Sequence, residues 1–142
     1  DRPEVQAMVR AERGLLANAL EEVLRMEPST HFAFRRACSD QARVGDTRIP
    51  EGDQIIMIYG AANRDPARWP DADRFDPHRD TTGHVSFGHS FHTCMGKELA
   101  RLEAVEYFNC FFYLAPAYAL VEADYGLSFP LRGPQQLLIR KA

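Results

Sequence analysis

The 142-residue sequence contains few cysteines, no long apolar run and no surplus of basic residues. Its three cysteines, an odd number, argue against a disulfide framework and for a reducing compartment, here expected to be the cytoplasm. No apolar stretch approaches the roughly 20 residues of a membrane span. The net charge of −3, with lysine and arginine scattered along the chain, argues against nucleic-acid binding. With 45% hydrophobic residues and no repeats or clear linker, the composition suits one folded domain.

The hydrophobic pattern predicts a mainly α fold with small β-sheets. Residues 14–26 repeat apolar side chains at helical steps until Pro28, and residues 95–112 show the same period. The aromatic side chains of the second helix that we expect in the core are Phe108, Phe111 and Phe112. Short apolar or alternating runs predict strands at residues 31–37, 42–45, 48–50, 54–59, 117–121, 127–131 and 136–139.

One cysteine stands where a glycine-bearing loop meets a predicted helix. Residues 87–96 read Phe-Gly-His-Ser-Phe-His-Thr-Cys-Met-Gly, and the helix follows Cys94 directly. Free backbone N–H groups and the helix dipole at such a position favour thiolate, the form of cysteine that binds metal. A lone cysteine is more often a small buried hydrophobe, so the neighbouring residues decide between the two. Gly88 can turn where other residues strain, Gly96 lets the backbone approach a flat ring, and His92 can hydrogen-bond a carboxylate.

Two upstream segments carry patterns of their own. Glu22 and Arg25 stand three residues apart on the first predicted helix and therefore project from one face. An isolated exposed pair of this kind contributes only about 0–1 kcal/mol. Residues 63–66 and 69–77 are rich in proline and aspartate and have no period, which predicts an ordered, meandering loop.

Together, these three segments resemble the cytochrome P450 family, in the order and with the separations found there. The family's haem-binding loop reads F-x-x-G-x-H/R-x-C-x-G, and residues 87–96 depart from it only at Ser90, where the family has glycine. The resemblance implies that Cys94 is the axial ligand of the iron in haem b. It implies equally that Phe87, Gly88, His92 and Gly96 bind this cofactor. The family glycine is expected to serve a tight bend at positive φ, which would strain Ser90.

The resemblance also assigns residues outside the loop. It implies a buried scaffolding cluster made of Glu22, Arg25 and, from the meander, Arg74, because two guanidinium groups around one carboxylate can pin an irregular loop. In the strand at residues 31–37 it implies that Arg35 binds a haem propionate, as His92 is expected to do. Alternate strand residues share a face, so the resemblance places His31 and Ala33 toward the substrate pocket.

As a whole, the chain resembles the C-terminal haem-binding portion, residues 1–142, of a single P450 domain of the soluble bacterial type. It begins without methionine inside a predicted helix. The resemblance implies that the N-terminal part of the enzyme, with the distal helix, is not included in these residues. The resemblance implies a monooxygenase that activates O2 to hydroxylate or oxidatively couple a small organic substrate. Electrons would come from a ferredoxin or flavodoxin-type donor, and no membrane or nucleic acid would be bound. Two alternatives stay open: a non-catalytic truncated remnant, and a peroxidase driven by peroxide.

Overall fold

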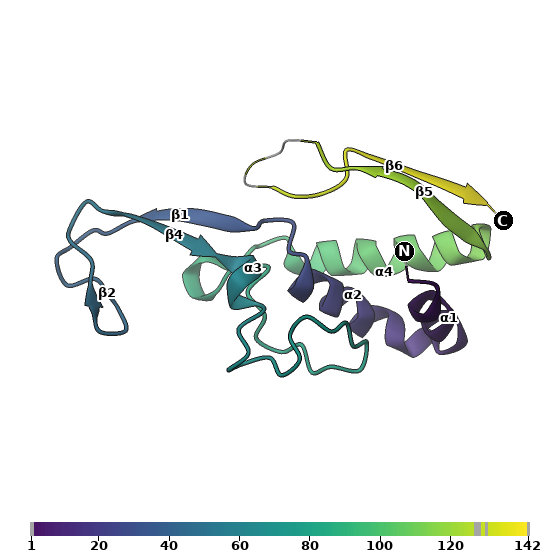
Figure 1. Cartoon of the computed structure of the whole chain (residues 1–142), viewed down its shortest axis with the longest axis horizontal. Helices are drawn as coiled ribbons and strands as arrows, with labels where there is room; N and C mark the ends of the chain where they lie inside the picture. Colours follow the sequence, from purple (N-terminus) through teal and green to yellow (C-terminus); the bar gives the residue numbers. More distant parts are fainter. Residues whose placement is uncertain (1, 127–128, 130, 142) are drawn as a thin grey trace.

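The computed structural model describes residues 2–126, 129 and 131–141 and shows a helical body from which two-stranded ribbons extend (Figure 1). The α-helices are α1 (Pro3–Ala11), α2 (Leu16–Met26), α3 (Tyr59–Ala62) and α4 (Lys97–Leu114), and the 3-10 helices are η1 (Arg13–Leu15) and η2 (Ser90–His92). The strands are β1 (Phe32–Arg36), β2 (Arg43–Val44), β3 (Thr47–Arg48), β4 (Gln54–Ile58), β5 (Tyr118–Asp124) and β6 (Gln136–Lys141). The predicted fold class, mainly α with small β-sheets, is confirmed.

The core lies where α1, α2 and α4 meet. The helical period of α2 puts Leu16 and Ala19 on one face, where they pack with Val9 of α1 and Phe112 of α4. Phe108 and Phe111 pack against this buried cluster, so the predicted role of the aromatic stripe as core is confirmed. The helix carrying this stripe begins at Lys97, two residues later than the periodicity predicted.

Each sheet is an antiparallel pair of strands. β1 pairs with β4, so that Ala33 lies opposite Met57 and Arg35 opposite Ile55. β2 pairs with β3, and β5 pairs with β6 through an irregularity between Leu120 and Glu122. The strand predicted at residues 127–131 falls partly outside the described residues; of its two described residues, Leu131 forms a bridge to Thr30.

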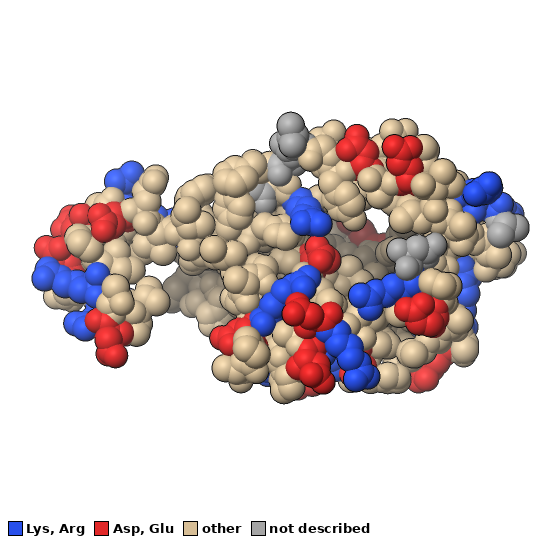
Figure 2. Space-filling view, in the orientation of Figure 1, with Lys and Arg blue, Asp and Glu red and all other residues tan. Residues whose placement is uncertain are grey.

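The surface mixes both signs of charge. Figure 2 shows basic and acidic side chains interspersed on one face, both at the β2 end and over the helical body. Among the described residues, no helix combines the length and the apolar character needed to cross a membrane.

Candidate functional site

The segment that carries Cys94 is a closed turn in front of α4. The Cys94 N–H donates to the Phe87 carbonyl oxygen across 2.7 Å, which closes the loop on itself. Gly96 is the N-cap of α4, and a Cβ added to it would lie 3.9 Å from the Cys94 Sγ. Cys94 is exposed just before the start of the helix, beside backbone N–H groups that have no partner within the helix.

Two residues of this loop adopt left-handed backbone conformations. Gly88 has a φ of 75°, and a Cβ there would lie 2.7 Å from the His92 carbonyl oxygen, so only glycine fits. Ser90 has a φ of 54°, although it is not glycine. The carbonyl of Ser90 accepts hydrogen bonds from the N–H and the hydroxyl of Thr93, at 3.0 and 2.8 Å, which hold the bend. The position does require a positive φ, and the loop keeps its bend with serine in place of glycine.

The surroundings of Cys94 suit a flat apolar group that needs one protein ligand. Phe91 and Met95 flank the cysteine with fully exposed side chains, which such a group could cover. Within residues 2–126, 129 and 131–141, no three His, Cys, Asp or Glu side chains gather to hold a metal ion. A haem iron takes four nitrogens from the porphyrin and can be held by a single cysteine thiolate. The residues present therefore fit a haem.

Behind the loop, Glu22 and Arg25 of α2 form a fully buried ion pair. The Arg25 Nε and Nη2 donate to the two carboxylate oxygens of Glu22 at 2.7 and 2.9 Å. Burial of Glu22 opposes ionisation, but hydrogen bonds, led by the one from Arg25, outweigh it and lower the pKa of this carboxyl. Arg25 also donates to the carbonyls of Asn63 and Ala72, and so ties the irregular segment after α3 to the helix.

The second arginine of this cluster is Arg79, and the prediction of Arg74 was wrong. Arg79 Nε donates to the Glu22 carboxylate at 3.0 Å. Its Nη atoms donate to the carbonyls of Pro70 and Asp71, at 2.6 and 3.1 Å, and to that of Arg74 at 3.2 Å. The side chain of Arg74 is exposed, and this residue serves the cluster only through its carbonyl. The meander turns after Arg74, so the arginine five residues later is the one that faces α2.

Strand β1 shows the alternation that the sequence predicted from Ala33 to Arg36, whereas Phe32, which precedes this stretch, is also half-buried. Ala33 and Arg35 are half-buried, whereas Phe34 and Arg36 are exposed. The Arg35 guanidinium donates to the neighbouring Phe34 carbonyl at 2.8 Å, its one side-chain hydrogen bond in the described part of the chain. His92, the other residue expected at a propionate, is exposed on η2.

His31 stands just before β1 and lines a hollow of about 450 Å³. Its Nε2 is buried and has no hydrogen-bond partner among the described residues. Four further residues that line this hollow are Phe32, Ile58, Tyr125 and Phe129. Ala33 does not line it, so of the two predicted pocket residues only His31 borders this space.

Comparison with known proteins decides the family. Residues 1–111 match the family model described as "Cytochrome P450". The chain belongs to the cytochrome P450 family.

Bacterial P450 enzymes are among its relatives. The chain is 40% identical to 6-deoxyerythronolide B hydroxylase of Saccharopolyspora erythraea, over 97% of this chain and 35% of that protein. It is 50% identical to cytochrome P450 107B1 of the same organism, over 72% of this chain and 25% of that protein. The crystal structure of P450BioI with an acyl carrier protein, ligated with hexadec-9Z-enoic acid, matches with a TM-score of 0.93 and 35% identity. That match covers 99% of this chain and 37% of P450BioI, so the chain spans about a third of such a P450.

Sequence reasoning also missed Asn63 as a structural residue of this P450 chain. Asn63 is 1% exposed, and its carbonyl accepts a hydrogen bond from Arg25 at 2.6 Å. Its amide oxygen accepts from the Val85 N–H, and its amide nitrogen donates to Ser86 Oγ, both at 2.8 Å. Asn63 therefore joins the Glu22 cluster to the segment that leads into the Cys94 loop. The sequence pattern gave no sign of this role, because an asparagine before Arg-Asp-Pro is equally typical of a turn.

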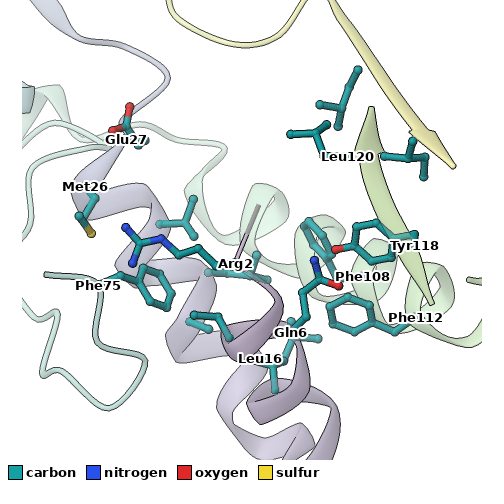
Figure 3. Close-up of a pocket in the computed structure, with 17 residues that line it drawn as sticks. Arg2, Gln6, Leu16, Met26, Glu27, Phe75, Phe108, Phe112, Tyr118 and Leu120 are labelled. Atoms are coloured by element: carbon teal, nitrogen blue, oxygen red, sulfur yellow. The ribbon is translucent and has the colours of Figure 1, made fainter. Parts of the chain in front are cut away.

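A second hollow, of about 470 Å³, lies among α1, α2, α4 and the β5–β6 pair (Figure 3). Phe75, Phe108, Phe112 and Tyr118 point into it, and Arg2 crosses one side. No residue of the loop at 87–96 lines this hollow, so it is separate from the candidate haem site.

Proposed function

We propose that this chain is the C-terminal haem-binding part of a single-domain P450 monooxygenase. Relatives such as 6-deoxyerythronolide B hydroxylase and P450BioI are about three times longer than this chain. This difference in length supports the proposal that residues 1–142 are only the C-terminal part of such an enzyme. The surface of α4 supports the same conclusion, because large apolar side chains there are 58–83% exposed. These side chains are Leu99, Leu102, Tyr107, Tyr113 and Leu114. Large apolar side chains left uncovered on one helix indicate a surface that another part of the protein covers.

The observation that carries the proposal is the exposed Cys94 just before α4, in a loop closed by Phe87 and turned at Gly88. Cys94 would be the single protein ligand of the iron in haem b. Gly96 would allow the porphyrin to approach the backbone closely, and Phe91 and Met95 would lie against it. When bound, a thiolate-ligated haem supplies reductive activation of O2 for hydroxylation or oxidative coupling of a substrate.

The remaining residues would orient the cofactor and shape the substrate side. The guanidinium of Arg35 and the exposed imidazole of His92 would each hold a propionate, because a cation or an N–H donor suits a carboxylate. The hollow beside His31 would form part of the substrate pocket, with Ala33 on the neighbouring stretch of β1. The buried cluster of Glu22, Arg25 and Arg79 would keep the meander in place behind the loop.

The substrate would be a small organic molecule, and the electrons would come from a ferredoxin or flavodoxin-type donor in the cytoplasm. Relatives whose names state a substrate support the breadth of this class. One is named a hydroxylase of 6-deoxyerythronolide B, another an epoxidase of cyclomarin C, and P450BioI was crystallised with an acyl group on a carrier protein.

The test is a carbon monoxide difference spectrum of the reduced full-length protein. We expect a thiolate-type, red-shifted Soret band in the wild type and in Cys110→Ser, and its loss in Cys94→Ser. Cys110 is the matched control, because it is also an exposed cysteine and lies on α4. A Cys94→Ser protein that keeps the band and the oxygenase activity would refute the ligand assignment. Turnover that needs peroxide but no electron donor would favour the peroxidase. Absence of haem uptake by a protein made of residues 1–142 would favour the remnant.

A further inference from the structure

A second charged network, separate from the Glu22 cluster, joins α2, the irregular segment and α4. Glu21 of α2 accepts two hydrogen bonds from Arg101 of α4, at 2.7 and 2.8 Å. The same carboxylate lies 2.9 Å from the His84 Nε2, whose side chain is only 4% exposed. His84 and Arg101 lie 63 and 80 positions from Glu21 in the sequence, so this network exists only in the folded chain.

The charges of this network are settled by its contacts. Burial opposes ionisation of Glu21, but hydrogen bonds from Arg101 and His84 outweigh it and lower the pKa of the carboxyl. The hydrogen bond to Glu21 raises the pKa of Arg101 in turn. Glu98, 72% exposed, adds a further ion pair to Arg101 at 3.1 Å from the solvent side. The result is an ionised, two-pronged pair between the helices.

The second nitrogen of His84 also has a hydrogen-bond partner. The Ser86 N–H donates to the His84 Nδ1 at 3.3 Å, so that nitrogen carries no proton. Nε2 therefore carries the proton and donates it in a hydrogen bond to Glu21. His84 thus links the backbone of the irregular segment to the α2 carboxylate.

The network meets the Cys94 loop at Phe87. The guanidinium carbon of Arg101 lies 5.1 Å from the centre of the Phe87 ring, and the His84 ring lies 6.3 Å from it. Phe87 is also the residue whose carbonyl accepts the Cys94 N–H. The contacts therefore run from Glu21 through Arg101 to the ring of Phe87, and from the backbone of Phe87 to that of Cys94.

We propose that Glu21, His84 and Arg101 are positioning residues that set the place of Phe87 and, through it, of Cys94. The functional importance of this positioning rests on the proposed haem–thiolate function, whereas the contacts themselves do not depend on it. Neighbouring helix positions point about 100° apart, so α2 uses Glu22 to hold the meander and Glu21 to hold the cysteine loop. Loss of the Glu21 charge would free the Phe87 ring and loosen the hydrogen bond that closes the loop.

The test compares Glu21→Gln and Arg101→Lys with Glu98→Gln in the full-length protein. Glu98→Gln is the matched control, because it removes a carboxylate that bonds the same arginine from outside the network. The first measurement is amide hydrogen exchange at Cys94, divided by exchange at core amides of α2, and it requires no bound haem. We expect this ratio to rise about tenfold in Glu21→Gln, as for the loss of one charge-assisted hydrogen bond, and less in Arg101→Lys. Glu98→Gln should stay within about twofold of wild type.

The second measurement is the rate at which the carbon monoxide complex loses its thiolate-type band. That rate should rise in Glu21→Gln, in parallel with the exchange ratio, and not in Glu98→Gln. Exchange that rises equally at Cys94 and at the core amides would mean that the network only stabilises the fold, and would overturn the proposal. An exchange ratio that changes as expected in a protein without any thiolate band would uphold the positioning role and refute the haem–thiolate function instead.

Discussion

Arg79 and Arg74 offer a matched pair for measuring what holds the meander to α2. Both are arginines of the same irregular segment, five positions apart, but only Arg79 reaches the Glu22 carboxylate. We expect Arg79→Ala to destabilise the full-length protein strongly and Arg74→Ala to leave it unchanged. The contrast separates the loss of a buried contact from the loss of a positive charge, because both variants lose the same charge.

The magnitude follows from the contacts that each substitution removes. Arg79 is 12% exposed at its side chain and donates one hydrogen bond to a fully buried carboxylate and three to backbone carbonyls. Removing one partner of a buried ion pair costs about 3–5 kcal/mol. Arg25 still neutralises Glu22 in the variant, so we expect a loss near 3 kcal/mol in the free energy of unfolding. For the exposed side chain of Arg74 we expect a change within about 0.5 kcal/mol.

The assay is denaturant unfolding of both variants beside the wild type, together with the yield of soluble haem protein. Arg79→Ala should unfold at a lower denaturant concentration and give less haem protein, because the meander lies next to the segment that leads into the Cys94 loop. Equal unfolding midpoints for the two variants would refute this reasoning. A larger loss in Arg74→Ala than in Arg79→Ala would restore the prediction made from the sequence alone.

Three other predictions concern the loop, the buried carboxylate and the propionate ligands. Ser90→Gly should stabilise the haem protein by about 1 kcal/mol, because the φ of 54° strains serine and not glycine. A melting curve should show the greater stability, and a redox titration should show an unchanged reduction potential of the iron. A shifted reduction potential would mean that serine alters the loop. Folding lowers the pKa of Glu22, so its contribution to stability is present at neutral pH. That contribution is lost as the pH falls below the ordinary glutamate pKa and through the lower folded value. Glu22→Gln should therefore be less stable than wild type at pH 7, with unfolding curves that converge in acid; a gap independent of pH would contradict the pKa shift. Arg35→Ala and His92→Ala should each release haem faster to an acceptor apoprotein while the thiolate band is kept, and unaltered transfer in both would count against propionate binding.

The sequence predicted what depends on local pattern. The helical periods around Leu16 and Phe112, the strands that became β1 and β4, and the turn before Cys94 all rest on neighbours within a few residues. Even the positive φ at Ser90 could be anticipated from the motif, because a single backbone conformation explains why glycine is usual there. These features form from short-range sterics and from one hydrophobic face, both of which the order of residues displays.

Contacts across long loops could not be predicted in the same way. The meander has no period, so nothing in the sequence distinguishes Arg79 from Arg74 as the partner of Glu22. The partners of Asn63 lie 22 and 23 positions further on, and those of Glu21 lie 63 and 80 positions away. The tertiary fold decides which polar side chain forms the hydrogen bond to a given buried group. A single sequence does not show these long-range pairings.

The two left-handed positions of the Cys94 loop differ in what they would tolerate if the loop were transplanted into another scaffold. Position 90 requires only a left-handed backbone conformation. Asparagine and aspartate enter that region more readily than most residues, so either should substitute there at a modest cost in stability. Position 88 requires both a left-handed conformation and the absence of a side chain, because any Cβ there would clash with the His92 carbonyl oxygen. A designer grafting this loop can therefore vary residue 90 to tune stability, but has no choice at residue 88.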